Sequence, residues 1–234
     1  MKQIAEVSPR TMARIAGVFY LLVFVLGGFA LFAGGKFIVK GNPAATAANI
    51  LAHETSFRIG WASNLISTAC YVVVTALFYR LFKPVSRSVA LSATFFSLVG
   101  CGLGAVSSIF QLAPLAILKN AQYAIAFRTD QLQTLAYTFL RLSADSVALV
   151  FFGFYCLQIG YLILKSTFLP RLIGVGMVIA GFGWLTFLWP PLSNSLAPYN
   201  LAPGILGEGL LTFWLLAAGV NAKRWNEQAV PEAV

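Results

Sequence analysis

Residues 15–34 read IAGVFYLLVFVLGGFALFAG and contain no charged side chain. About 20 apolar residues in helical conformation cross the hydrocarbon core of a bilayer. Apolar and polar residues do not alternate here, so the stretch is not typical of a barrel strand. Without a closed barrel, a chain in lipid satisfies its backbone groups by forming a helix. The stretch therefore predicts a membrane-spanning helix.

Similar apolar stretches recur along the chain, and we predict an all-α fold: one membrane domain over residues 1–234, a polytopic bundle of six transmembrane helices. The composition agrees, because 59% of residues are hydrophobic and 10% are charged, against about 25% charged in soluble domains. The mean hydropathy is +0.82. We interpret the first stretch as an uncleaved span, because it is longer than a signal-peptide core. The six spans are expected at about residues 12–34, 59–82, 89–118, 134–164, 172–190 and 203–222.

The basic residues predict the orientation, because cytoplasmic loops of membrane proteins are enriched in Lys and Arg. The two termini and the even-numbered connections hold ten: Lys2, Arg10, Arg14, Arg80, Lys83, Arg87, Lys165, Arg171, Lys223 and Arg224. The other connections hold five: Lys36, Lys40, Arg58, Lys119 and Arg128. We therefore predict a plasma-membrane protein with both termini in the cytoplasm. This clustering accounts for the net charge of +9 without a nucleic-acid partner, which would need a continuous basic face.

Two of the predicted outer loops have sequences that indicate local structure. Residues 43–54 begin with Pro43 and predict a short helix on the outer membrane face, with His53 at its solvated edge. Residues 190–203 contain four prolines and predict an ordered turn or lid. Aromatic residues near the span ends fit the belts found at membrane interfaces. These are Trp184, Trp189, Tyr199 and Trp225.

Small residues inside the spans indicate close helix packing. Gly100 and Gly104 in the third span, and Gly174, Gly176 and Ala180 in the fifth, predict faces where backbones approach closely. We expect packing within one chain, with a dimer seam as the alternative; the oligomeric state stays open. The three cysteines, Cys70, Cys101 and Cys156, lie in apolar stretches without metal-ligand spacing and are expected to be packing residues.

Polar residues inside the spans indicate a candidate site. An ionised group in hydrocarbon costs a few kcal/mol, so it needs a partner or water. Asp145 in the fourth span and Glu208 in the sixth are both expected in the outer half of the bilayer. Residues from other spans are expected at the same depth. We predict a ligand-binding pocket near the 190–203 loop, lined by Arg58, Gln111, Arg141, Asp145 and Glu208.

An alternative interpretation needs no ligand. Arg141 lies one helical turn before Asp145 and can pair with it, and Arg58 could pair with Glu208. These ion pairs would fix helix register only. Asp145 and Glu208 could also act as an acid and a base on a lipid, but no nucleophile or phosphate cradle accompanies them. With His53 as the sole histidine, we predict no metal site and no cofactor.

Three functions remain in competition. The first is a binder or carrier of a small polar or amphipathic molecule, and we favour it. The second is an accessory or structural membrane protein whose charges only pair. The third, a lipid-acting intramembrane enzyme, has the least support. The predicted partners are the lipid bilayer and a small-molecule or lipid ligand.

A longer motif links the chain to a known family. Residues 151–174 read FFGFYCLQIGYLILKSTFLPRLIG and resemble a bacterial membrane family known as domain of unknown function 4386. That family's pattern is Phe-Phe-Gly, Gly-Tyr-Leu, a basic-Ser pair and Leu-Pro-basic before a Gly. The resemblance covers nearly the whole chain. Further matches are Arg14-x-Ala-Gly with Tyr20-Leu-Leu, Phe57-Arg58-x-Gly60, and Glu208 followed by Trp214-Leu-Leu.

The resemblance implies a multi-span helical protein and supplies no activity. It adds weight to Arg58 and Glu208, which fall on recurrent positions of the family. The chain also departs from the pattern, because members carry a histidine shortly before Phe-Phe-Gly. Here that stretch reads Arg141-Leu-Ser-Ala-Asp145, which puts any role of such a histidine in doubt for this chain.

Overall fold

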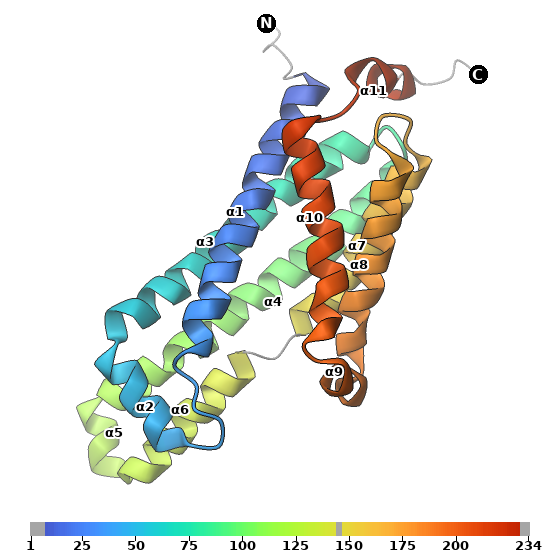
Figure 1. Ribbon diagram of the computed structural model, residues 1–234. Helices are drawn as coiled ribbons and strands as arrows, with labels where there is room; N and C mark the ends of the chain where they lie inside the picture. The colour runs from blue at the N-terminus through green and yellow to red at the C-terminus, as the bar shows by residue number, and fades with distance from the viewer. Residues whose placement is uncertain (1–7, 144–146, 230–234) are drawn as a thin grey trace, which may run out of the picture. The chain divides into compact units, whose positions relative to one another are not determined.

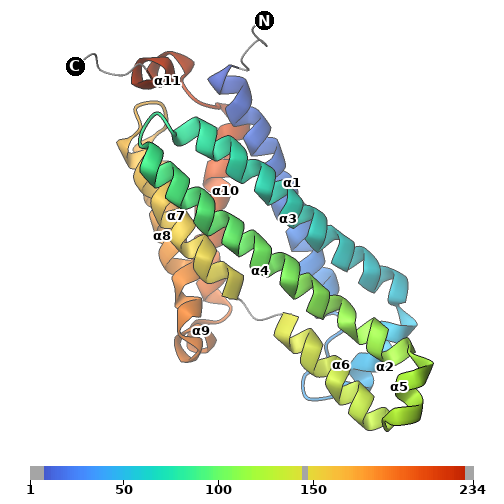
Figure 2. The same cartoon turned by 180° about the vertical axis from the view of Figure 1, so that it is seen from behind.

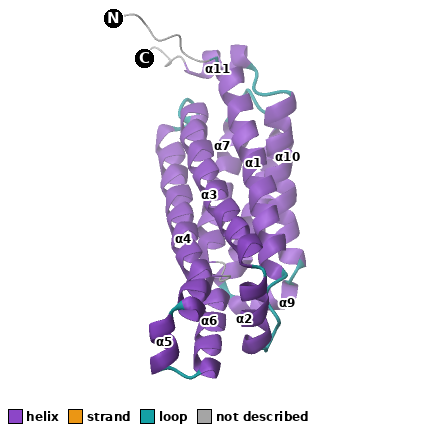
Figure 3. Cartoon of the chain, turned by 90° about the vertical axis from the view of Figure 1, so that its left-hand side faces the viewer, coloured by secondary structure: helices purple, strands orange, loops and turns teal. Residues whose placement is uncertain are grey.

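The computed structural model describes residues 8–143 and 147–229. Within these residues every regular element is a helix (Figure 3), which confirms the all-α prediction. Figure 1 labels the α-helices. The elements are α1 (Pro9–Gly35), α2 (Pro43–Ala52), α3 (Glu54–Phe82), α4 (Arg87–Lys119), α5 (Ala121–Ala126), α6 (Thr129–Ser143), α7 (Val147–Lys165), α8 (Arg171–Leu185), η1 (Thr186–Leu188), α9 (Pro190–Leu196), η2 (Tyr199–Leu201), α10 (Ala202–Ala217) and α11 (Ala222–Ala229).

The predicted number of spans is also confirmed. Among the described residues, six helical stretches are long and apolar enough to cross a bilayer: Pro9–Gly35, Glu54–Phe82, Arg87–Lys119, Thr129–Lys165, Arg171–Leu188 and Tyr199–Ala217. Large apolar side chains on these stretches stay exposed; Leu31 and Leu172 each keep 71% of their surface. Such a surface needs lipid as its solvent. The chain is a multi-pass membrane protein.

The chain folds into two compact units. The first contains Met1–Leu21, Cys70–Cys101 and Ser146–Val234, and the second contains Leu22–Ala69 and Gly102–Asp145. We call the first the glutamate unit, because it contains Glu208. We call the second the loop unit, because it contains the long connections around α2 and α5. Helices α1, α3 and α4 each contribute one part of their length to each unit.

Close packing of α7, α8 and α10 organises the glutamate unit. Figures 1 and 2 both show α7 and α8 side by side, as antiparallel neighbours. A Cβ on Gly160 would lie 2.9 Å from the carbonyl oxygen of Gly174, and one on Gly174 would lie 3.0 Å from that of Gly160. Gly153 and Gly181 form a second reciprocal pair, at 3.1 and 2.9 Å. Backbones therefore touch at two levels, as small residues allow in membranes.

The loop unit has a small apolar core under its connections. Helix α2 packs against α6. Buried residues from α2, α3, α4, α6 and the segment after α1 meet in one cluster: Phe37, Ile50, Phe57, Leu115 and Leu140. The short helix predicted between the first two spans is present as α2. Asn42 caps it by accepting a hydrogen bond from the Ala45 backbone N–H at 2.9 Å, and Pro43 occupies its first turn.

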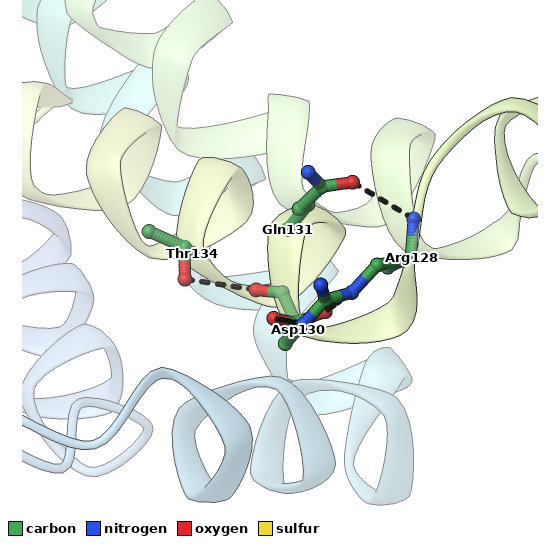
Figure 4. Close-up of polar contacts among 4 residues, drawn as sticks. All are labelled: Arg128, Asp130, Gln131 and Thr134. Atoms are coloured by element: carbon green, nitrogen blue, oxygen red, sulfur yellow. Dashed lines mark hydrogen bonds and ion pairs between the residues drawn. The ribbon is translucent and has the colours of Figure 1, made fainter.

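Helix α6 begins earlier than the predicted fourth span, at Thr129 instead of about residue 134. Figure 4 shows the reason: the Gln131 side chain accepts a hydrogen bond from the Arg128 backbone N–H at 3.0 Å, which closes the first turn. The Arg128 guanidinium also forms an ion pair with Asp130 at 2.6 Å. Polar residues start this helix, ahead of the apolar stretch from which the span was predicted.

The connection over residues 190–203, the second of the predicted outer loops, is more regular than expected. Residues 190–203 form helix α9 and the 3₁₀ turn η2 before α10 begins. Two prolines start α9, where their missing N–H groups cost nothing. At its end, Asn200 is buried and donates a hydrogen bond to the Ser193 hydroxyl at 3.1 Å. The prolines here therefore start a helix as well as turning the chain.

Candidate functional site

The Glu208 carboxyl group is the centre of a polar cluster inside the glutamate unit. Glu208 lies on α10 and keeps only 6% of its surface exposed. Its Oε1 accepts a hydrogen bond from Trp184 Nε1 at 2.5 Å and from Cys156 Sγ at 3.6 Å. Its Oε2 accepts from the Tyr20 hydroxyl, and from the Tyr71 hydroxyl at 3.2 Å. Helices α1, α3, α7, α8 and α10 thus meet at one carboxyl group.

All four donors to this carboxyl group are uncharged. An ionised carboxylate offers about four acceptor positions, and four donors reach them here. Among residues 8–143 and 147–229 the ion pairs are Arg58–Glu54, Lys119–Glu54 and Arg128–Asp130, so none of them includes Glu208. The protein therefore holds this acid by hydrogen bonds alone.

Aromatic rings enclose the cluster. The ring of Tyr71 packs against Tyr20, Phe152 and Tyr155, with centroid separations of 5.5, 4.6 and 5.9 Å. The Tyr155 hydroxyl is buried, and no hydrogen-bond partner reaches it in the described part of the chain. Ring faces carry partial negative charge, and a carboxyl group adds to it. The chemistry of this cluster of side chains suits a cation or a hydrogen-bonding group.

Glycines on α10 bring the carboxyl group to its partners. A Cβ on Gly204 would overlap the Trp184 indole, and one on Gly207 would overlap the backbone carbonyl of Gly176 on α8. Only glycine fits at such an approach. These two positions, one and four residues before Glu208, let the indole N–H reach the acid.

The five residues predicted to line the pocket are distributed over both units. Glu208 lies in the glutamate unit, whereas Arg58, Gln111 and Arg141 lie in the loop unit. Asp145 lies outside the described residues, and with it the expected Arg141–Asp145 pair. Gln111 is half-buried on α4, and Arg141 is exposed in the last turn of α6.

Arg58 is engaged within the loop unit. Its guanidinium forms an ion pair with Glu54 at 2.8 Å, and Lys119 binds the other oxygen of Glu54 at 2.7 Å. In the described residues Arg58 therefore pairs with Glu54, and Glu208 accepts hydrogen bonds from uncharged donors. The alternative Arg58–Glu208 pair does not form there. Glu54, which the sequence analysis did not single out, bridges the start of α3 to the end of α4.

The hydrogen-bond partners of Glu208 were missed as site residues. Trp184 was expected in an interfacial belt, but it is buried with 8% exposure and donates to the acid. Cys156 was expected to be a packing residue; it is buried, but its thiol also faces Glu208. Tyr20 and Tyr71 look like other aromatic residues of apolar spans. The available signal was the acid itself, because a buried carboxyl group requires donors from neighbouring spans.

The family of the chain follows from comparison with known proteins. The family model described as "Domain of unknown function (DUF4386)" matches residues 15–219. The chain belongs to this DUF4386 family. The match covers both units and all the elements around Glu208, and it confirms the resemblance found in the sequence.

One relative shares part of the sequence of this DUF4386 chain. An uncharacterized protein of Archaeoglobus fulgidus is 27% identical over 151 residues, which cover 63% of this chain and 76% of the relative. No solved structure matches the chain. The family description names no activity, so the chemistry of the protein has to be inferred from its residues.

Proposed function

We propose that this DUF4386 protein binds or carries a small polar or amphipathic molecule, with Glu208 as the polar anchor of the site. One observation carries the proposal: a buried carboxyl group on a membrane-spanning helix is held by uncharged donors, beside a buried Tyr155 hydroxyl that lacks a partner in the described residues. An ionisable group inside a membrane is costly and is typical of ligand and ion pathways.

The surroundings of Glu208 favour a cationic ligand. A carboxyl group combined with the ring faces of Tyr20, Tyr71 and Tyr155 attracts an organic ammonium ion. A ligand ammonium group would lie against the carboxyl oxygens that Trp184 and the tyrosines now contact, attracted by charge and by the rings, and the Tyr155 hydroxyl oxygen adds a further partial negative charge. The ligand we infer is therefore a small cation with an apolar body.

The orientation of the protein is part of the proposal. We infer a cytoplasmic-membrane location with both ends inside, supported by the ten basic residues of the predicted inner segments against five in the outer ones. Arg10 Nε donates to the Ala218 carbonyl at 3.4 Å and Arg14 to that of Ala217 at 3.3 Å. The start of α1 and the end of α10 therefore share one end of the glutamate unit.

Thermal unfolding of the purified protein with three probes tests the proposal. Benzyltrimethylammonium, glucose and decanoate represent a cation, a neutral polar molecule and an anionic amphiphile. We expect the cation to raise the melting temperature of the wild type and of Glu227→Gln, an exposed acid on α11, but not that of Glu208→Gln. Equal responses of Glu208→Gln and the wild type to all three probes would contradict the proposal.

A second candidate function is structural. The hydrogen bonds of Glu208 join five helices, so the cluster could serve only to hold them together. This candidate predicts that Glu208→Gln lowers stability by about 1–3 kcal/mol and that no probe stabilises the wild type. The same melting experiment therefore separates the two functions.

A further inference from the structure

A groove in the loop unit shares no residue with the Glu208 cluster and belongs to no part of the function proposed above. It encloses about 470 Å³ between the end of α1, helix α2 and the start of α3. Apolar side chains form one part of it, including Phe29, Phe32 and Ile59. Polar side chains form the other part, namely Lys36, Asn49, His53 and Ser56.

The two parts of the groove differ in kind. Phe29, Phe32 and Ile59 belong to spans of α1 and α3 and keep 46%, 67% and 51% of their surface exposed. Lys36 follows directly after the end of α1 and is exposed. A groove lined by exposed apolar side chains together with a lysine and polar side chains matches a molecule with an acyl chain and an anionic head group.

Lys36 is available to an anionic head group. Its ammonium group lies 4.2 Å from the centroid of the Phe32 ring, so it already sits over the apolar part of the groove. None of the three ion pairs of the described residues includes Lys36. The nearby acid, Glu54, is occupied by Arg58 and Lys119. His53, Asn49 and Ser56 add hydrogen-bond donors around the same end.

The floor of the groove is formed independently of any ligand. Phe37 is buried with 6% exposure, and its ring packs edge-on against Phe57 at 5.4 Å. Ile50, from α2, is buried with 1% exposure in the same core. A ligand would therefore meet a preformed surface, which reduces the entropy lost on binding.

We propose that this groove binds a membrane phospholipid with an anionic head group. The phosphate lies against Lys36 with hydrogen bonds from His53 and Asn49, and an acyl chain lies along Phe29, Phe32 and Ile59. Charge complementarity selects an anionic lipid over a zwitterionic one, because the described lining of the groove offers a lysine and hydrogen-bond donors and includes no carboxylate. The bound lipid would tie α1, α2 and α3 together at the membrane interface.

Lipid titration of the purified full-length protein tests this site. Mixed micelles contain phosphatidylglycerol or phosphatidylcholine with identical acyl chains, and binding is followed by native mass spectrometry. We expect phosphatidylglycerol to bind more tightly than phosphatidylcholine, and Lys36→Gln to weaken its binding about five-fold. The matched control Lys40→Gln removes an exposed lysine outside the groove and should keep wild-type affinity.

Two further measurements assign the occupant. Ile59→Trp fills the apolar part and should weaken phosphatidylglycerol without affecting melting in lipid-free detergent. Glycerol phosphate, the head group without its chains, should not compete with the lipid. Equal affinity for the two lipids, equal effects of Lys36→Gln and Lys40→Gln, or competition by glycerol phosphate would each overturn the proposal. Glu208→Gln should keep the lipid preference, so the lipid site and the Glu208 site are tested independently of each other.

Discussion

Glu208 shows how an acid in a membrane-spanning helix can be held by uncharged donors, with no basic partner among residues 8–143 and 147–229. Two hydroxyl groups, an indole N–H and a thiol reach its oxygens. Hydrogen bonds to a charged group contribute about 1.5–3 kcal/mol each, more than those between neutral groups. The contribution of each donor to stability depends on whether its hydroxyl or N–H reaches the acid. Two residues of the same type in the cluster can therefore be told apart by mutation.

Tyr20 and Tyr155 provide such a comparison, because both are fully buried tyrosines beside Tyr71. The Tyr20→Phe change removes a donor to Glu208 and should lower the free energy of unfolding by about 1–3 kcal/mol. The Tyr155→Phe change removes a buried hydroxyl without a partner in the described residues, so stability should stay constant or rise. Unfolding in increasing sodium dodecyl sulfate measures both.

Two other outcomes of this comparison would change the interpretation. If Tyr155→Phe destabilises the protein as much as Tyr20→Phe does, the assignment of donors around Glu208 is wrong. If Tyr155→Phe keeps stability but loses the response to benzyltrimethylammonium, its hydroxyl belongs to the ligand site.

At the scale of elements, the α7–α8 pair depends on two reciprocal glycine contacts. Gly160 faces Gly174, and Gly153 faces Gly181, so that each backbone carbonyl occupies the space where a side chain would be. Packing of this kind replaces the hydrophobic driving force that helices lack in lipid. It also makes the interface sensitive to a single methyl group.

Gly160→Ala should therefore destabilise the protein. The added Cβ would lie 2.9 Å from the Gly174 carbonyl oxygen and 2.7 Å from a Val178 methyl group, and overpacking of this kind costs about 1–3 kcal/mol. The matched control is Gly209→Ala on α10, where a Cβ meets nothing within 4 Å. Detergent unfolding midpoints compare the two, and equal midpoints would contradict the close contact.

The sequence predicted the helices well because lipid leaves few options. Apolar stretches of sufficient length must become helices, so all six spans follow from composition. Helix starts depended on local capping, and α6 begins at Thr129 through Gln131 and Arg128, outside the apolar pattern. Helix α9 was missed as a helix because Pro190 and Pro191 indicate a turn as much as a first helical residue.

The candidate site was predictable only in part. Glu208 was identified because a buried acid stands out in an apolar span. Its donors were not, because Trp184 carries one polar atom on a large apolar body, and such a residue fits an interface or a core equally well. Pairing rules also favoured arginine as the partner of an acid, whereas Arg58 binds Glu54. Which of two acids an arginine reaches depends on tertiary distances that spacing does not contain.

At the scale of the whole molecule, the three cysteines offer a way to test the proposed orientation. Cys70, Cys101 and Cys156 are free and buried, so the native protein should react slowly with a membrane-impermeant maleimide. Exposed residues in the connections can then be replaced by cysteine one at a time, against a low background. Each replacement reports the side of the membrane on which its connection lies.

Tyr199→Cys and Lys83→Cys form a suitable pair. Tyr199 is 80% exposed in the connection between α9 and α10, and Lys83 is exposed after α3. With both termini in the cytoplasm, intact cells should label Tyr199→Cys at once and Lys83→Cys only after permeabilisation. The opposite pattern would place both termini outside and would remove the basis of the charge-count argument.

The reciprocal glycine pairs also bear on how the chain is made. The ribosome delivers α7 before α8, and only residues 166–170 separate them. Because both glycine pairs lie within these two helices, the pair can complete its interface before α10 packs against it. The C-terminal part of the protein can thus enter the membrane as a preassembled two-helix piece, onto which α10 later docks through Gly207 against Gly176.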